Sequence, residues 1–277
     1  MMKKINCALA LLLFSFSGYA VAASSDSSPF DGFYAGAQLG MVYGLFQHTT
    51  DATANGSLFQ LPEVPPSLPQ PPPFPNNISV SDSASNLGAD AGLHAGYGHV
   101  FAKKYYLGTE INGDFQTVSV SAHSIVSSPP TADTYATLTY SGRLANTYGI
   151  VLRPGYLISP TLMVYLKGGI QGSRLTGSST AGYGLTPGAP VYSSTTTGSK
   201  EVMGWVTGIG IEKRASNHFG FRFEDLISGY GGVNASTTQT FSNGRTFPFN
   251  KTGVVTNSMH ITPYTNVLMA GVDYYLG

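Results

Sequence analysis

The sequence predicts an all-β protein, an eight-stranded antiparallel transmembrane β-barrel with long extracellular loops. Three observations lead to this fold class. Charged residues make up only 10% of the chain, which is few for the surface of a soluble domain. Glycine is abundant, with 34 residues, and aromatic residues reach 12%. Segments of about ten residues also alternate between large apolar and small or polar side chains, as barrel strands in a membrane do.

The N-terminus has the features of a cleaved signal peptide. Two lysines precede a short apolar run, and Ala20-Val21-Ala22 supplies a small-residue cleavage pattern. The apolar run is too short for a membrane-spanning helix. We therefore expect residues 1–22 to be removed and residues 23–277 to form one outer-membrane barrel domain. The mature domain contains no cysteine, because Cys7 lies within the signal peptide.

Each expected strand places large apolar residues on one face and small or polar residues on the other. The first four strands are expected at residues 33–43, 88–101, 105–116 and 144–156. In the third of these, Leu107, Ile111 and Phe115 alternate with Glu110 and Asp114. The apolar face is expected to meet lipid and the polar face to line the lumen.

The last four strands are expected at residues 161–174, 202–213, 218–225 and 266–277. The clearest of them alternates Phe219, Phe221 and Phe223 with Arg222 and Glu224. Frequent glycine within these segments argues against helices. A soluble barrel of the lipocalin kind would bury its apolar face and expose its charges. Here the charges share a face with glycine, which suits the narrow lumen of an eight-stranded membrane barrel.

Short and long connections alternate along the chain, as expected for periplasmic turns and extracellular loops with both termini in the periplasm. Short connections are expected near Lys103, Pro160 and Ser216, and long loops at residues 45–87, 117–142, 175–200 and 232–263. Within the fourth loop, Asn243-Gly244 is a two-residue hairpin signal. This hairpin is expected to project above the membrane, and a ten-stranded barrel that includes it remains an alternative.

The long loops are nearly uncharged and carry the candidate contact residues. Leu61–Pro75 is rich in proline and cannot pair into a sheet. We expect it to form an extended polyproline II stalk outside the cell. The apolar side chains expected to contact a host or environmental surface are Leu58, Phe59, Phe74, Phe241 and Phe247.

Nine charged residues are expected to face the lumen. They are Asp90, Glu110, Asp114, Arg153, Lys167, Glu212, Arg222, Glu224 and Asp273. One interpretation is a structural network, in which opposite charges neutralise one another because unpaired buried charge is costly. The other is a charged conduit for ions or small solutes. The network is favoured, because eight strands leave little bore.

Other polar residues give no pattern typical of catalysis, metal binding or cofactor binding. His94 and His99 fall on opposite strand faces, so they cannot share a metal ion. His123 and Ser124 are adjacent and would also point apart. The net charge of zero gives no reason to expect nucleic acid. Aromatic residues near strand ends are expected to form interface girdles, namely Tyr34, Tyr43, Tyr97, Tyr105, Tyr106, Tyr148, Tyr156, Trp205 and Tyr264.

Several motifs resemble the opacity and surface-antigen family of Gram-negative outer-membrane β-barrels. Gly155-Tyr156 ends one strand, Tyr165 with Gly168-Gly169 marks the next, and Glu224 follows an aromatic-rich strand. "FDGFYAGAQLG" resembles the usual mature start of the family. The chain departs from the family at its end, where Leu276-Gly277 stands in place of a terminal aromatic residue. We therefore expect a shifted or weak signal for the barrel-assembly machinery.

The resemblance implies a surface-exposed protein of the adhesin, invasin or immune-contact type, embedded in outer-membrane lipid. It brings no catalytic or cofactor residues with it. A small-solute porin and, less favoured, a barrel enzyme acting on lipid A or peptides remain alternatives.

Overall fold

The computed structural model describes residues 28–56, 77–127, 135–184, 192–242 and 251–276. No helix among these residues is long and apolar enough to cross a membrane. The expected signal peptide, the proline-rich segment and four candidate contact residues (Leu58, Phe59, Phe74 and Phe247) lie outside the described residues.

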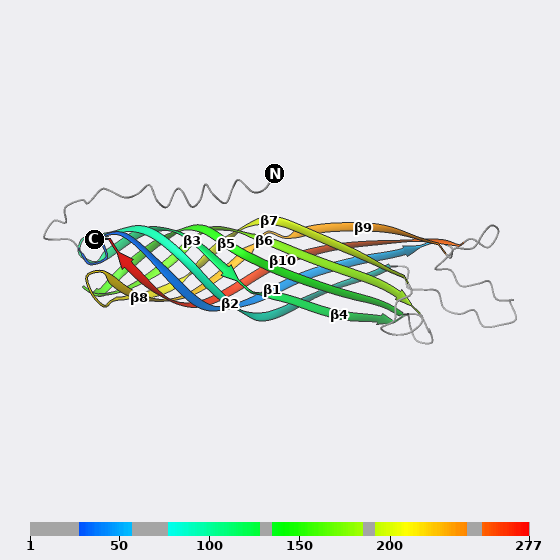
Figure 1. The fold of residues 1–277 in the computed structure, drawn as a ribbon, viewed down its shortest axis with the longest axis horizontal. Helices are drawn as coiled ribbons and strands as arrows, with labels where there is room; N and C mark the ends of the chain where they lie inside the picture. Colours follow the sequence, from blue (N-terminus) through cyan, green and yellow to red (C-terminus); the bar gives the residue numbers. More distant parts are fainter. Residues whose placement is uncertain (1–27, 57–76, 128–134, 185–191, 243–250, 277) are drawn as a thin grey trace.

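The described residues form ten β-strand segments arranged as an elongated barrel (Figure 1). In chain order they are β1 (Gly32–Asn55), β2 (Asn77–Phe101), β3 (Tyr105–Gln116), β4 (Ser119–Ser127), β5 (Tyr135–Ser159), β6 (Leu162–Gly184), β7 (Tyr192–Arg214), β8 (Phe219–Tyr230), β9 (Val233–Ser242) and β10 (Thr252–Tyr275).

The ten segments occupy eight positions in a closed antiparallel ring. Strands pair in the order β1-β2-β3-β5-β6-β7-β8-β10, and β10 returns to β1. β4 pairs with β5 beyond β3, and β9 pairs with β10 beyond β8. The prediction of an eight-stranded antiparallel barrel is therefore confirmed, and β9 adds no position to the ring.

Three short turns join strands at the end of the barrel where the C-terminus lies (Figure 1), called the turn end below. They fall at residues 102–104, 160–161 and 215–218, as predicted. In the first turn the φ angles of Ala102 and Lys103 are 49° and 62°. The amide of Lys104 donates to the carbonyl of Phe101 at 3.1 Å. Two successive positive φ angles are typical of a type I′ turn.

The strands continue far into the segments that were expected to be loops, and this expectation was wrong. β1 extends to Asn55 and β2 already begins at Asn77. The hairpin formed by β9 and β10 pairs Ser242 with Thr252, and Asn243-Gly244, where a two-residue turn was predicted, lies outside the described residues. Serine and threonine alternate with apolar residues in these stretches, which is itself a strand pattern.

The long strands β1, β2, β5, β6, β7 and β10 invert their hydrophobic pattern about halfway along their length. In the half nearer the turn end, large apolar side chains lie on the exterior. They include Phe33, Leu39, Leu93, Leu107, Ile111, Phe115, Ile150, Leu152, Leu166, Ile170, Ile209, Phe221 and Phe223. On β1 this belt covers Phe33 to Tyr43, about 34 Å along a strand and roughly 25 Å along a tilted barrel axis. Such a belt suits the hydrocarbon core of a membrane.

We call the other half the extension. It comprises residues 45–55, 77–87, 119–127, 135–143, 175–184, 192–202, 233–242 and 252–263. Its exterior is rich in serine and threonine, whereas apolar residues fill its interior, among them Val120, Leu138, Leu175, Val202, Val255 and Ile261. Apolar residues inside and polar residues outside are what water on the exterior requires.

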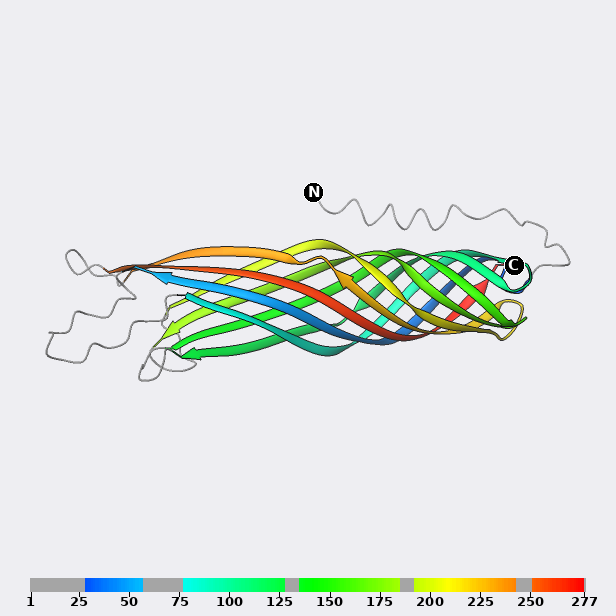
Figure 2. The same ribbon diagram turned by 180° about the vertical axis from the view of Figure 1, so that it is seen from behind.

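The extension consists of two facing sheets. Among the described residues, β4 has no ladder with β2, and β9 has none with β7. One sheet therefore contains β9, β10, β1 and β2, which lie side by side in Figure 2, and the other contains β4 to β7. The two open seams begin at the last bonds of the closed ring. These join the Thr117 amide to the Ala89 carbonyl and the Gly231 amide to the Met203 carbonyl, each at 3.0 Å.

Candidate functional site

The nine charged residues predicted to face the lumen all lie there and are buried. They come from seven strands, β2, β3, β5, β6, β7, β8 and β10, and none is more than 6% exposed. Their even spacing on alternate strand positions sends each side chain to the same side of the barrel wall. Seven of them form one connected cluster, which we call the lumen network: Glu110, Arg153, Lys167, Glu212, Arg222, Glu224 and Asp273.

Glu110 is the centre of the lumen network. Its Oε2 lies 3.3 Å from Arg153 and 2.8 Å from Arg222, and its Oε1 lies 2.7 Å from Lys167. Arg153 also reaches Glu212 at 2.8 Å. Burial in the narrow lumen removes these charges from water. The three cations around Glu110, and Glu212 beside Arg153, compensate one another there.

Arg222 and Lys167 connect the remaining carboxylates. Arg222 holds Asp273 through two hydrogen bonds, from Nε at 2.8 Å and from an Nη at 2.5 Å. Lys167 lies 3.0 Å from Glu224. The two-point contact between the Arg222 guanidinium and Asp273 fixes the geometry of both side chains. The network thus joins strands from all around the ring.

Sequence reasoning missed several uncharged partners of the lumen network. The hydroxyls of Tyr34, Tyr165 and Tyr275 donate to Glu110, Glu224 and Glu212 respectively. His94 Nε2 lies 2.6 Å from Asp273 Oδ1. Their position on the same strand face as the charges was the signal that could have found them.

Two tyrosines assigned to the interface girdle lie in the lumen instead. Tyr34 is 1% exposed and Tyr106 is 2% exposed. The girdle assignment was wrong for both, because their even sequence positions place them on the inward face. Tyr43, Tyr97 and Trp205 do lie on the exterior.

The lumen is filled at the level of the network. The side chains of Glu110, Arg153 and Arg222 are 0% accessible. On the turn-end side, apolar and aromatic residues pack across the barrel, among them Phe30, Leu157, Met163 and Tyr275. Packed side chains therefore enclose the charges, and the lumen has no open passage at this level.

Two of the nine predicted residues stand apart from the network. Asp114 accepts hydrogen bonds from Gln38 at 2.7 Å and Asn112 at 2.6 Å. Asp90 is 2% exposed. Among the described residues neither carboxylate has an ion-pair partner.

A polar contact inside the extension joins its two sheets. The ring of His48 on β1 stacks on Tyr140 of β5 with centroids 3.2 Å apart, and His48 Nδ1 donates to the Asp82 carbonyl at 3.0 Å. Burial lowers the pKa of His48 from its ordinary value, and the bond to Asp82 offsets part of this effect. His48 is therefore held neutral between the sheets.

The exterior of the extension carries pairs of hydroxyl groups across neighbouring strands. Ser141 and Ser178 lie 2.9 Å apart, and Thr180 and Thr195 also lie 2.9 Å apart. On the opposite sheet, Ser236 and Ser258 lie 2.8 Å apart. Such cross-strand hydroxyl pairs give a rigid polar surface whose side chains are held in place.

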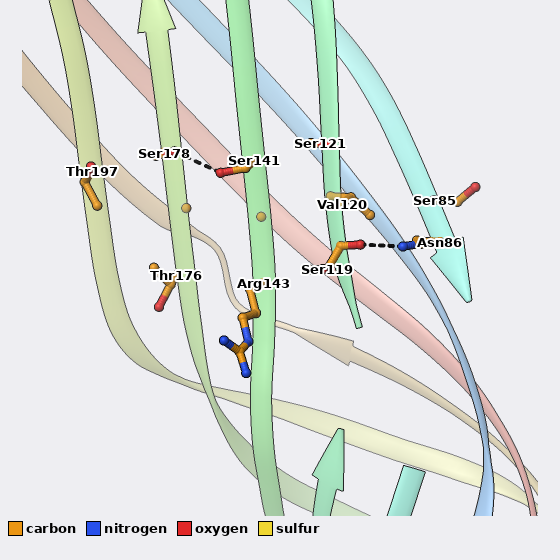
Figure 3. A pocket seen from close by; sticks show the side chains of 12 residues that line it. Ser85, Asn86, Ser119, Val120, Ser121, Ser141, Arg143, Thr176, Ser178 and Thr197 are labelled. Atoms are coloured by element: carbon orange, nitrogen blue, oxygen red, sulfur yellow. Dashed lines mark hydrogen bonds between the residues drawn. The ribbon is translucent and has the colours of Figure 1, made fainter. Parts of the chain in front are cut away.

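A shallow groove of about 780 Å³ crosses this surface over β4 to β7 and reaches β2 across the seam (Figure 3). Its wall consists almost entirely of small polar side chains with one arginine, namely Ser85, Asn86, Ser119, Ser121, Ser141, Arg143, Thr176, Ser178 and Thr197. Asn86 Nδ2 donates to the Ser119 carbonyl at 2.8 Å and bridges the seam beside the groove (Figure 3). This groove could not be predicted from the sequence, since it depends on how five strands curve together.

Phe241, the one candidate contact residue among the described residues, is only partly exposed. Its ring meets Tyr192 edge-on at 5.5 Å and packs against the apolar interior of the extension. Part of its apolar surface is therefore used within the protein, unlike the freely exposed contact that was expected.

The histidines show no catalytic or transition-metal arrangement in the part of the chain that the structure describes. His123 lies on the exterior with Nδ1 2.8 Å from the Thr139 hydroxyl. Ser124 is its neighbour on the strand and points to the other face. No group of three or more His, Cys, Asp or Glu side chains among the described residues could hold a metal ion.

No protein-family model and no curated protein matches the chain. Solved structures do match. The outer membrane protease OmpT from Escherichia coli is 12% identical, covering 90% of this chain and 98% of its own, with a TM-score of 0.43. The attachment invasion locus protein Ail of Yersinia pestis is 10% identical over 88% of this chain and 99% of its own, with a TM-score of 0.30.

The outer membrane protein OprG from Pseudomonas aeruginosa is 13% identical over 88% of this chain and 97% of its own, with a TM-score of 0.27. With TM-scores below 0.5, none of these likenesses carries a functional argument for this chain.

Proposed function

We propose that this protein is an outer-membrane surface protein that contacts polar ligands outside the cell through the exterior of its extension. The observation that carries the proposal is the inversion of the hydrophobic pattern along the six long strands. The apolar belt fits a bilayer, and the hydroxyl-rich continuation of the same strands fits water. In this orientation the turn end faces the periplasm and the extension stands outside the cell.

The groove over β4 to β7 is the best candidate for the contact surface. Its hydroxyl, amide and guanidinium groups are donors and acceptors held by strand pairing, so little side-chain entropy is lost on binding. Arg143 supplies the only charge along its wall. These groups suit a polysaccharide or another polar surface more than an apolar ligand.

The alternative of a small-solute porin has less support. The lumen network and the apolar cluster at the turn end fill the barrel, and the side chains of Arg153 and Glu110 are 0% accessible. A barrel enzyme likewise lacks support, since His123 and Ser124 lie on opposite strand faces.

The proposal can be tested by the adhesion of liposomes that carry the full chain to panels of immobilised neutral and anionic polysaccharides. Ser141→Trp fills the groove from an exposed strand position, so it should fold normally and abolish adhesion. Thr238→Trp is the matched control, because it places the same side chain on the exterior of β9 outside the groove.

Adhesion of Ser141→Trp liposomes equal to that of the native protein would exclude the groove. Adhesion of native liposomes no greater than that of protein-free liposomes across the whole panel would contradict the surface-contact function.

A further inference from the structure

The charges in the lumen do not balance. Six carboxylates, on Asp90, Glu110, Asp114, Glu212, Glu224 and Asp273, face four cations, Arg153, Lys167, Arg222 and, near the turn end, Arg214. Four of the carboxylates lie within 3.4 Å of a cation. Among the described residues, Asp90 and Asp114 have no cation within 4.0 Å. The excess negative charge therefore sits at one level, on the side of the network nearer the extension.

Asp90 is both buried and unpartnered. Asp90 is 2% exposed. In the part of the chain that is described, neither its Oδ1 nor its Oδ2 has a hydrogen-bond partner. A buried carboxylate without a partner is unfavourable. Either a proton or a bound cation must compensate it.

The strand register brings the two carboxylates to neighbouring positions. Asp90 on β2 pairs with Gln116 on β3, and two residues along, Gly92 pairs with Asp114. Asp114 reaches across Gly92, since its Oδ1 lies 1.9 Å from where a Cβ of residue 92 would be. Positions two apart on one strand face are about 7 Å apart. The Asp114 carboxylate therefore extends over β2 beside Asp90, into space that glycine leaves free.

Gln38, Asn112 and Thr147 donate to Asp114, but three amide oxygens nearby have no donor in the described part of the chain. Oε1 of Gln38, Oε1 of Gln116 and Oδ1 of Asn112 are buried and without a hydrogen-bond partner among the described residues. Gln38 pairs with Gly92 in the register and already binds Asp114 through its Nε2. Unpartnered oxygens of the Asp90 carboxylate and of three amides, beside the hydrogen-bonded Asp114 carboxylate, thus line one level of the lumen.

A proton does not fit this arrangement as well as a cation. One proton neutralises a single carboxylate and leaves the amide oxygens without a donor. Calcium takes six to eight oxygens in flexible geometry, and carboxylates and amide carbonyls are its usual protein ligands. The four candidate ligands offer only oxygen atoms, which disfavours softer metals.

We propose that the lumen binds a hard divalent cation of the calcium class through the carboxylates of Asp90 and Asp114, with side-chain oxygens of Gln38 and Gln116 completing the site. The network closes the site on one side. The apolar interior that begins with Val42 and Val267 closes it on the other. The ion therefore enters during folding and is retained afterwards. This site is independent of the proposed surface contact.

The test uses the full chain refolded into detergent micelles with either calcium chloride or EDTA. Calcium should raise the Tm by roughly 5–10 °C, the shift expected at about 100 times the Kd for a chain of this size. Asp90→Asn should abolish this shift. In EDTA the Asp90→Asn variant should have a higher Tm than the native protein, because the substitution removes an uncompensated buried charge. The control Asp225→Asn alters an exposed carboxylate that contacts Asn266 and should keep the full shift.

The second readout is the ion itself. Elemental analysis of native protein refolded in calcium and then desalted should find retained calcium, which Asp90→Asn and Asp114→Asn should each lose. A native protein that neither retains calcium nor shifts its Tm overturns the proposal. Full calcium shifts in both variants would place the ion elsewhere. Stabilisation of the native protein by acid alone, without a calcium effect, would assign the compensation to a proton and equally overturn it.

Discussion

Single residues in the lumen serve several partners at once. Glu110 forms ion pairs with Arg153, Lys167 and Arg222, whereas Glu212 depends on Arg153 as its one ion-pair partner among the described residues. Arg153 also lies over the ring of Tyr165 at 4.1 Å. Substitutions at these positions should therefore differ in cost according to the charge that each leaves unpaired.

Arg153→Met should destabilise the barrel by about 3–5 kcal/mol, since it leaves the buried Glu212 carboxylate without a cation. Urea unfolding in lipid vesicles measures the change. Adding Glu212→Gln to this variant should recover part of the loss. Lys213→Met, at an exposed position bonded to Thr161, should change stability by less than about 0.5 kcal/mol. Equal losses in the single and double variants would argue against charge compensation.

His48 should make the stability of the extension dependent on pH. Burial lowers the pKa of His48 in the folded protein, so below its unfolded value of about 6.5 the unfolded chain binds more protons. The stabilising contribution of neutral His48 is complete above this value and is lost as the pH falls through the lowered pKa. The free energy of unfolding, measured at pH values from about 8 to about 5, should show this loss.

The matched control for His48 is a variant that keeps an aromatic ring without titrating. His48→Phe should flatten the pH dependence, whereas His123→Phe on the exterior should leave it unchanged. An unaltered profile in His48→Phe would assign the pH dependence to other groups.

At the scale of strands, one face keeps its direction while its chemistry changes. On β10 the inward positions pass from Asp273 through Met269 and Val267 to Ile261 and Met259. The alternation is unbroken, so the strand does not flip. What changes is the chemistry of the two faces, from charged inside and apolar outside near the turn end to apolar inside and polar outside in the extension.

This explains which elements the sequence could predict. The belt strands carry rows of Phe, Leu and Ile against Gly and charge, which is a strong signal for lipid-facing strands. In the extension the outward positions hold serine and threonine, as at Ser193 and Thr195, instead of the large apolar residues that mark a lipid-facing strand. These stretches therefore resembled loops in the sequence. The prediction of loops was wrong because large apolar outward residues mark a strand only where its exterior meets lipid.

The turn between β2 and β3 offers a test at this scale. Ala102 and Lys103 both have positive φ, which costs a residue with a side chain about 1 kcal/mol or more relative to glycine. Lys103→Gly should therefore stabilise the barrel by roughly 0.5–1 kcal/mol in urea unfolding. Lys104→Gly, whose φ is not in this region, should give no gain. A loss in Lys103→Gly would show that its side chain, and not its backbone, determines the turn.

At the scale of the whole molecule, the filled lumen separates this barrel from an open channel. The position of the nine inward charges could be predicted from alternation alone. Their pairing could not, because contacts such as those of Glu110 with Arg222 join strands that are far apart in sequence. The seams and the groove were equally out of reach, since they depend on where strand pairing ends.

The full chain inserted in planar bilayers should give no steady conductance of the nanosiemens class expected of porins, because packed side chains close the lumen. Insertion is checked by the protection of the belt strands from added protease. Steady openings in a preparation that passes this check would contradict the closed lumen.

The two seams give the molecule two mechanical regimes. A closed tube resists torsion, whereas a tube slit along two lines twists easily because its halves slide past each other. On the turn-end side of Thr117 and Gly231 the ring is closed. In the extension, the stack of His48 on Tyr140 couples the two sheets inside, and the side-chain bridge from Asn86 couples them at the seam. A pull or twist applied at the outer tip is therefore taken up as shear between the sheets. The charged lumen inside the membrane is insulated from it.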